Sequence, residues 1–288
     1  MSVLLDLCSD LLRGSAHKRR AGGALYGSTN GAHLYLDLLK KCLCNYIYDD
    51  DLDLQQGETA LDPLTGKYVT VKGAPFDPAK KFYGGIWPSR AHTMIGIPRL
   101  NNIQFCVEQV LANDIPGDLI ETGVWRGGAT IFMRGILKAY GVRNRKVWVA
   151  DSFEGLPVAD HARYPRETNL EFHKEGELTI SLDEVRRNFE RYDLLDEQVR
   201  FLKGWFSETL PGAPIATLAV VRLDGDMYES TMDGLVNLYP KLSPGGFAIV
   251  DDYNVVQACN EAVDDYRKDH GITAELQMIP GAGTFWMK

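Results

Sequence analysis

The sequence predicts an α/β protein with a doubly wound, mainly parallel sheet of seven strands. From Ile95 onward, short apolar runs of strand length alternate with segments of helical periodicity, and this alternation is typical of successive β–α–β units. Acidic residues follow several of these runs directly. Such positions lie at the carboxyl edge of a parallel sheet, where this fold class binds its ligands.

Seven apolar runs account for the strands. They are residues 118–123, 147–151, 199–202, 218–223, 247–250, 275–279 and 284–287, the last two as a closing antiparallel hairpin. Helices are expected at residues 97–113, 128–140, 181–192, 233–239 and 258–269. In the third of these helices Ser181 is the expected N-cap, and Glu184 completes a capping box.

The first 90 residues differ in character from the rest. We therefore predict an N-terminal helical extension and lid at residues 1–90 and an α/β domain at residues 91–288. Apolar residues at helical spacing predict a helix over 34–47. The acidic triplet 49–51 is expected to be a solvated loop, with a metal site as the alternative. Residues 52–80 are rich in Gly, Pro, Asp and Lys and are expected to form a loop or lid. The alternative is that this third of the chain packs against a second subunit.

Composition narrows the class of partner. The 288 residues carry a net charge of −8, so we expect no nucleic-acid partner. No signal peptide or long apolar span is evident, and we expect no membrane partner. The five cysteines are scattered and odd in number, which indicates a reducing cytoplasm. Cys42-x-Cys44 lacks the second pair that a zinc site of this kind needs.

Two pairs of carboxylates end two of the predicted strands. Asp224 and Asp226 follow one strand, and Asp251 and Asp252 follow the next. Like charges packed together raise one another's pKa, and a hard divalent cation such as Mg²⁺ is the usual compensation. A spare carboxylate can then act as a base. The pairs predict a metal-assisted enzyme; the alternative for Asp226 is a cap of the following helix.

The turn at residues 120–128 joins the first strand of the sheet to its helix. Its glycines allow a ligand to approach the backbone, but their spacing differs from the G-x-G-x-x-G pattern of dinucleotide sites. Asp151 ends the next strand, where such folds bind ribose hydroxyls with a carboxylate; its alternative role is an N-cap. A nucleoside ligand without pyrophosphate fits both observations, and S-adenosylmethionine (SAM) is the candidate.

Five motifs in order resemble the macrocin O-methyltransferase (TylF-type) family. They are ETGVWRGG at 121–128, ADSFEGLP at 150–157, LKGWF at 202–206, LDGDMYEST at 223–231 and GGFAIVDDY at 245–253. The resemblance runs from about Tyr35 to the C-terminus. It implies the class I SAM methyltransferase fold, which is Rossmann-like. It also implies SAM and Mg²⁺ as cofactors, and methylation of sugar hydroxyls in antibiotics such as macrolides and aminocoumarins.

The resemblance also implies roles for individual residues. Asp224, Asp251 and Asp252 would bind the metal, and Asp226 would be the general base. The implied SAM contacts are Thr93, Met94, Glu121, Gly123, Asp151, Ser152, Ser181, Gly204, Trp205 and Phe206.

Other residues and other functions stay open at this point. His92 is an alternative base, whereas His173 is expected to be solvated. Trp125, Tyr228 and the aromatic segment 82–87 could form walls for the acceptor. A catechol is the alternative acceptor, because vicinal phenols also chelate Mg²⁺. A nicotinamide-dependent oxidoreductase would share the fold, but this sequence lacks the glycine pattern of a dinucleotide site. A non-catalytic SAM-binding protein would not need the four acids at the two strand ends. We expect a homodimer or a higher homo-oligomer.

Overall fold

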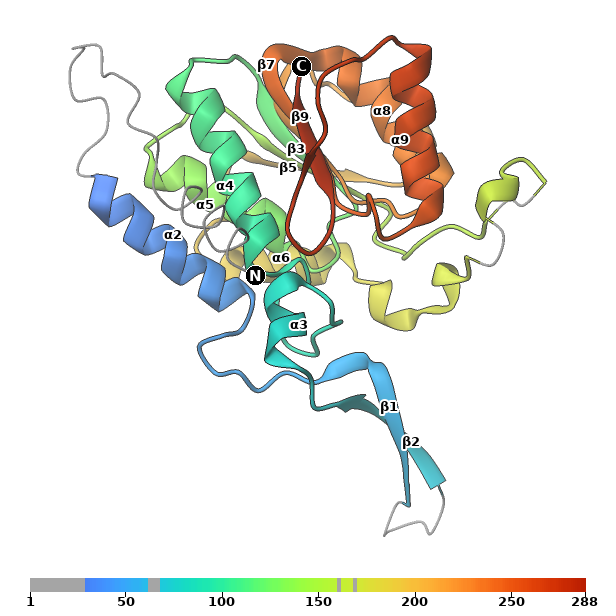
Figure 1. Cartoon of the computed structure of the whole chain (residues 1–288). Helices are drawn as coiled ribbons and strands as arrows, with labels where there is room; N and C mark the ends of the chain where they lie inside the picture. Colours follow the sequence, from blue (N-terminus) through green and yellow to red (C-terminus); the bar gives the residue numbers. More distant parts are fainter. Residues whose placement is uncertain (1–28, 62–67, 160–161, 168–169) are drawn as a thin grey trace, which may run out of the picture.

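The computed structural model describes residues 29–288 apart from 62–67, 160–161 and 168–169, and its centre is a seven-stranded sheet (Figure 1). The strands are β3 (Asp118–Thr122), β4 (Val147–Asp151), β5 (Val199–Lys203), β6 (Leu218–Leu223), β7 (Leu242–Val250), β8 (Gln277–Met278) and β9 (Thr284–Met287). Their order is β5-β4-β3-β6-β7-β9-β8; β3 to β7 are parallel, and β9 is antiparallel to both of its neighbours. The predicted fold class is confirmed.

Helices cover both faces of this sheet. They are α4 (Gly96–Ala112), α5 (Gly128–Ala139), α6 (Leu182–Arg191), α7 (Phe206–Thr209), α8 (Tyr228–Leu238) and α9 (Gln257–Asp269). Figure 1 shows α4 and α5 on one side and α8 and α9 on the other, and each side has its own buried apolar cluster. Because both faces are covered, the strands are nearly continuous apolar runs, which is why the sequence revealed them.

Several boundaries differ from the prediction. Helix α8 begins at Tyr228, five residues before the expected start, because polar residues at 229–231 conceal its first turn. Strand β7 begins at Leu242, since the Ser-Pro-Gly-Gly segment that looks like a turn continues the strand through a register shift. The predicted strand 275–279 is only Gln277–Met278.

The N-terminal part contains more regular structure than the sequence suggested. Helix α2 (Thr29–Leu43) packs its buried Leu36, Leu39 and Leu43 against the domain. Residues 53–74, expected as a loop, form an antiparallel hairpin of β1 (Asp53–Leu61) and β2 (Tyr68–Ala74) that projects beyond the domain (Figure 1). The alternating Tyr-Val-Thr-Val at 68–71 was the overlooked strand signal. Residues 1–28 of the predicted extension lie outside the described residues.

The acidic triplet that follows α2 is only partly solvated, contrary to expectation. Asp51 is 5% exposed and accepts hydrogen bonds from the N–H groups of Arg90 (2.6 Å) and Ala91 (3.1 Å). Lys81 of α3 (Pro78–Tyr83) lies 2.9 Å from carboxylate oxygens of both Asp49 and Asp51. These partners compensate the burial of the charge. The triplet therefore connects the segment after α2 with α3 and with residues 90–91.

Among the described residues, the structure contains no helix that combines the length and the apolar character needed to cross a membrane.

Candidate active site

A cavity of about 720 Å³ lies at the carboxyl ends of β3, β4, β6 and β7. Most residues that were predicted to form a site line it. They are Thr93, Met94, Glu121, Gly123, Asp151, Ser152, Trp205, Phe206, Asp224, Asp226, Asp251 and Asp252. Trp125 lines it as well, whereas Tyr228 instead donates a hydrogen bond to Asp265 (3.0 Å).

Two predicted cofactor contacts are not among the residues that line the cavity. Ser181 is exposed, and its hydroxyl oxygen accepts from the N–H of Glu184 (3.2 Å) as the N-cap of α6. Gly204 donates its N–H to the carbonyl of Asp151 (2.9 Å) with a φ of +137°. Both residues support neighbouring segments, so their contact with SAM stays a prediction.

Glycines bring the backbone of the cavity floor together. Gly123 has a φ of +80°, and a Cβ there would overlap the carbonyl oxygen of Asp224. A Cβ at Gly128, at the start of α5, would lie 2.6 Å from the side chain of Thr93. These close approaches place the 92–94 segment and the end of β6 beside the β3–α5 turn.

Asp151 is held by backbone donors. Its carboxylate accepts from the N–H groups of Val124 and Phe153, each at 2.7 Å, and Ser152 donates to the carbonyl of Gly155 (2.6 Å). Burial raises the pKa of Asp151 despite these donors. The carboxylate is therefore fixed in orientation at the cavity wall.

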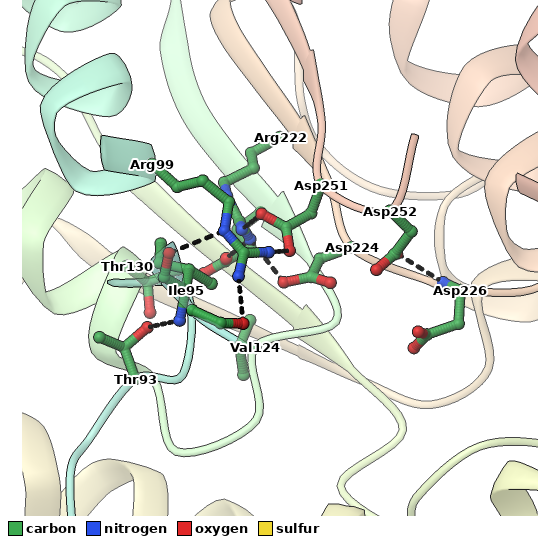
Figure 2. Close-up of polar contacts among 12 residues, drawn as sticks. Thr93, Ile95, Arg99, Val124, Thr130, Arg222, Asp224, Asp226, Asp251 and Asp252 are labelled. Atoms are coloured by element: carbon green, nitrogen blue, oxygen red, sulfur yellow. Dashed lines mark hydrogen bonds and ion pairs between the residues drawn. The ribbon is translucent and has the colours of Figure 1, made fainter. Parts of the chain in front are cut away.

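Three carboxylates converge beyond the β3–α5 turn (residues 123–127), which we call the cofactor turn. Oxygen atoms of Asp224, Asp226 and Asp252 lie within 4.8 Å of one another, and Asp252 accepts from the N–H of Asp226 (3.0 Å; Figure 2). Asp226 has a φ of +56°, an uncommon conformation for a residue with a side chain. Burial, and then neighbouring acids, raise the pKa of Asp224 to about 6 and that of Asp226 to about 7, and they raise the pKa of Asp252 well above its usual range.

Asp251 lies beside this group but faces two arginines. One carboxylate oxygen pairs with Arg99 and the other with Arg222, which also contacts Glu121 and Asp224 (Figure 2). Burial raises the pKa of Glu121 to about 8, and the Arg222 guanidinium opposes this shift. The site therefore contains more acids than arginines: five acids, counting Glu121, lie around two guanidinium groups.

The histidine proposed as an alternative base is not part of the acidic cluster. The Nδ1 atom of His92 lies 2.6 Å from the hydroxyl oxygen of Tyr192, and its Nε2 atom lies 3.3 Å from Arg191. Burial, together with the neighbouring arginines, lowers the pKa of His92 to about 4. His173 is in a short 3-10 helix with no buried residue. Neither histidine lines the cavity.

Sequence reasoning missed the two arginines. Arg222 is fully buried within the apolar run of β6, and a charged residue there was a signal, because it requires anionic partners. Arg99 gave no comparable signal, because a helix with an arginine in its first turns is ordinary. Tyr83 and Trp87 of the aromatic segment 82–87 line the cavity, and their contact with an acceptor stays a prediction.

Comparisons with known proteins agree with this geometry. Residues 32–288 match the model of the macrocin O-methyltransferase (TylF) family. The chain is 54% identical over 258 residues to the 8-demethyl-8-(2,3-dimethoxy-α-L-rhamnosyl)-tetracenomycin-C 4′-O-methyltransferase of Streptomyces olivaceus, covering 88% of this chain and 92% of that protein. It is 50% identical to the demethyldecarbamoylnovobiocin O-methyltransferase of Streptomyces niveus, covering 91% and 95% respectively.

A solved structure extends the likeness to three dimensions. The O-methyltransferase NovP superposes with a TM-score of 0.78 at 50% identity, covering 89% of this chain and 99% of that one. The family match spans the sheet, both carboxylate pairs and the cofactor turn. The chain therefore belongs to the macrocin O-methyltransferase (TylF) family and is a SAM-dependent O-methyltransferase.

Proposed function

We propose that this enzyme transfers the methyl group of SAM to a sugar hydroxyl of a glycosylated natural product, with Mg²⁺ in the acidic cluster. The observation that carries the proposal is the convergence of Asp224, Asp226 and Asp252 within a cavity that also contains the cofactor turn. The acceptor class is supported by a relative at 54% identity, whose name specifies a rhamnosyl-bearing substrate.

The residues present fit a hard divalent cation. The cluster offers only carboxylate oxygens, which Mg²⁺ prefers, and the acids here outnumber the two neighbouring arginines. Asp226 and Asp252 would hold the ion, with the carboxylate of Asp224 beside them. Asp251, implied as a ligand by the resemblance, is engaged by Arg99 and Arg222 in this structure. Bound Mg²⁺ would supply the positive charge that lowers the pKa of a nearby hydroxyl.

Two carboxylates are candidates for accepting the hydroxyl proton. The resemblance implies Asp226, whereas placement favours Asp224, whose N–H donates to the carbonyl of Thr122 (2.9 Å) beside the cofactor turn. Arg222 binds one oxygen of Asp224 (2.7 Å) and leaves the other for the acceptor. We propose Asp224 as the proton acceptor, with Asp226 as the alternative.

The remaining residues bind and orient the reactants. SAM supplies an electrophilic methyl group. Asp151 would accept hydrogen bonds from the ribose of SAM. Glu121 has one buried carboxylate oxygen that lacks a hydrogen-bond partner among the described residues, and this oxygen would accept a hydrogen bond from the cofactor. Trp205 and Phe206 would cover the cofactor and exclude water. Alignment of the hydroxyl with the methyl group then supplies much of the rate enhancement.

A screen of purified protein tests the acceptor class. The enzyme would be incubated with SAM and Mg²⁺ against matched panels of glycosides, their free aglycones and simple catechols, with mass detection of products that have gained CH₂. Methylation confined to the glycosides supports the proposal. Methylation of catechols alone would replace it with the catechol reading.

Chelation tests the metal. EDTA is expected to abolish turnover, because the carboxylates alone lack the positive charge that lowers the hydroxyl pKa. Added Mg²⁺ should restore the rate, and S-adenosylhomocysteine binding, measured by calorimetry, should largely survive chelation. Full activity after exhaustive chelation would show that Mg²⁺ is not required. The proposed acceptor class does not depend on this result.

Binding of Mg²⁺ is expected to strengthen as pH rises from about 5 to about 8, because ligands must lose their protons before they bind a cation. The raised pKa values of Asp224 (about 6) and Asp226 (about 7) place the transition near neutrality. Calorimetric titration in buffers of different ionisation enthalpy would measure both the affinity and the released protons. Affinity that does not change with pH would show that the carboxylates are already ionised without the metal.

Deletion of the β1–β2 hairpin tests the prediction that this region is a lid. Deletion of residues 57–72 with a short Gly/Ser bridge keeps Gln55, the residue of β1 that lines the cavity. If the hairpin orders over the acceptor, the acceptor KM should rise strongly while S-adenosylhomocysteine affinity stays within a few fold. Unchanged acceptor kinetics, with loss of a dimer in light scattering, would favour a role in subunit packing.

A further inference from the structure

Arg99 is a buried arginine to which the sequence analysis assigned no role. It lies in the first turn of α4 and is 7% exposed. Its Nε donates to the carbonyl of Ile95 (2.7 Å), its Nη2 donates to the carbonyl of Gly84 (3.0 Å), and its Nη1 pairs with Asp251 (Figure 2). One guanidinium group therefore joins the start of α4, the end of α3 and the end of β7.

The helix ends joined by Arg99 touch backbone to backbone. Gly84 closes α3 with a φ of +74°, and a Cβ there would overlap Arg99 and lie 2.6 Å from the carbonyl oxygen of Ile95. A Cβ at Gly96, the first residue of α4, would lie 2.6 Å from the nitrogen of Gly84. The position of α3 thus depends on this contact, and neither glycine can be replaced without displacing it.

The end of α3 forms one wall of the cavity, which we call the acceptor wall (residues 83–87). Tyr83, Gly84, Gly85 and Trp87 line the cavity there, and a Cβ at Gly281 of the β8–β9 turn would lie 2.5 Å from the carbonyl oxygen of Tyr83. The cofactor turn and Asp151 belong to β3 and β4, in the other half of the sheet. The acceptor wall therefore lies on the side of the acidic cluster away from the cofactor turn, the side that the proposed function gives to the acceptor.

The other end of this contact chain is the acidic cluster itself. Asp251 pairs with Arg99 through one oxygen and with Arg222 through the other, and Arg222 continues to Asp224. A run of charged contacts thus connects the carbonyl of Gly84 with the proposed proton acceptor. Lysine could not replace Arg99, because a single ammonium group lacks the planar fork that reaches Ile95, Gly84 and Asp251 together.

We propose that Arg99 is a positioning residue that holds the acceptor wall in register with the carboxylates, so that acceptor binding depends on it and cofactor binding does not. The assignment of the wall to the acceptor rests on the proposed function. The anchoring of α3 by Arg99 does not rest on it.

The test is Arg99→Lys, which keeps the charge and removes the fork. Hydrogen exchange of peptides covering 78–88 is expected to be about tenfold faster, as for the loss of one net hydrogen bond to a locally opening segment. With the best glycoside from the screen, acceptor KM should rise about tenfold while kcat and S-adenosylhomocysteine affinity stay within about threefold, the pattern of lost binding rather than lost chemistry. Arg90→Lys is the matched control, because Arg90 is exposed and pairs with Asp50 at 3.0 Å.

A second variant, Gly84→Ala, and titration with S-adenosylhomocysteine provide independent tests of the proposal. Gly84→Ala displaces α3 from Arg99 without changing any charge, and it should reproduce the faster exchange even if Arg99→Lys folds poorly. Unchanged exchange at 78–88 in both variants overturns the proposal. A tenfold loss of S-adenosylhomocysteine affinity in Arg99→Lys, with acceptor KM unchanged, also overturns it and makes Arg99 a cofactor ligand. If no glycoside is methylated, the proposed function fails while the exchange result still decides the anchoring.

Discussion

Asp224→Asn is expected to lower the Mg²⁺-saturated kcat by about 10²-fold or more, because an amide cannot accept the proton that the sugar hydroxyl must lose. The change preserves the size of the side chain and its ability to accept from Arg222. Binding of Mg²⁺ and of S-adenosylhomocysteine should both stay nearly intact. Steady-state kinetics at saturating metal, together with calorimetric titrations of metal and cofactor product, would measure the three effects separately.

The same measurements on Asp226→Asn distinguish a base from a ligand. If Asp226 mainly binds the metal, its variant should show weaker Mg²⁺ affinity, and excess Mg²⁺ should restore much of the rate. If Asp226→Asn instead lowers the Mg²⁺-saturated kcat and Asp224→Asn weakens Mg²⁺ affinity, Asp226 is the base, as the resemblance implies. Asp183→Asn is the matched control, because Asp183 is exposed in the first turn of α6, away from the cavity.

The sequence was sufficient to place the acidic cluster but not to orient its members. Parallel strands end at the same edge, so acids after β6 and β7 had to lie close together. Asp251 and Asp252 follow β7 in a bend, where Asp252 joins Asp224 and Asp226 and Asp251 pairs with two arginines. Which of the two joins depends on Arg99 and Arg222, contacts of long sequence separation that no local pattern contains.

A similar limit applies to the N-terminal part. The helical periodicity of α2 was readable because one side of it is buried. The hairpin was harder to predict, because its pairing depends on two separate segments, 53–61 and 68–74, and the composition of the region is that of a loop. Asp51 looked solvated because Lys81, its partner, lies thirty residues along the chain.

Arg222→Met is expected to be the most destabilising single change in the catalytic domain. Arg222 is fully buried and contacts three carboxylates, and removing one member of a buried ion pair typically costs about 3–5 kcal/mol. Methionine fills a similar volume, so the loss would reflect uncompensated charge more than a void. Urea unfolding without added metal, followed by circular dichroism, would measure the change in the free energy of unfolding.

The pH dependence and a second substitution identify charge as the cause. Burial already raises the pKa of Glu121 to about 8 and that of Asp224 to about 6, and loss of the Arg222 guanidinium raises both pKa values further. Acids with raised folded-state pKa values destabilise the fold as pH rises above their unfolded values, so the deficit of Arg222→Met should be smaller at about pH 5 than at about pH 8. Adding Glu121→Gln to Arg222→Met should recover part of the loss at the higher pH, because it removes one of the uncompensated charges. A deficit that is the same at both pH values, and that Glu121→Gln does not reduce, would mean that Arg222 stabilises the domain through packing alone.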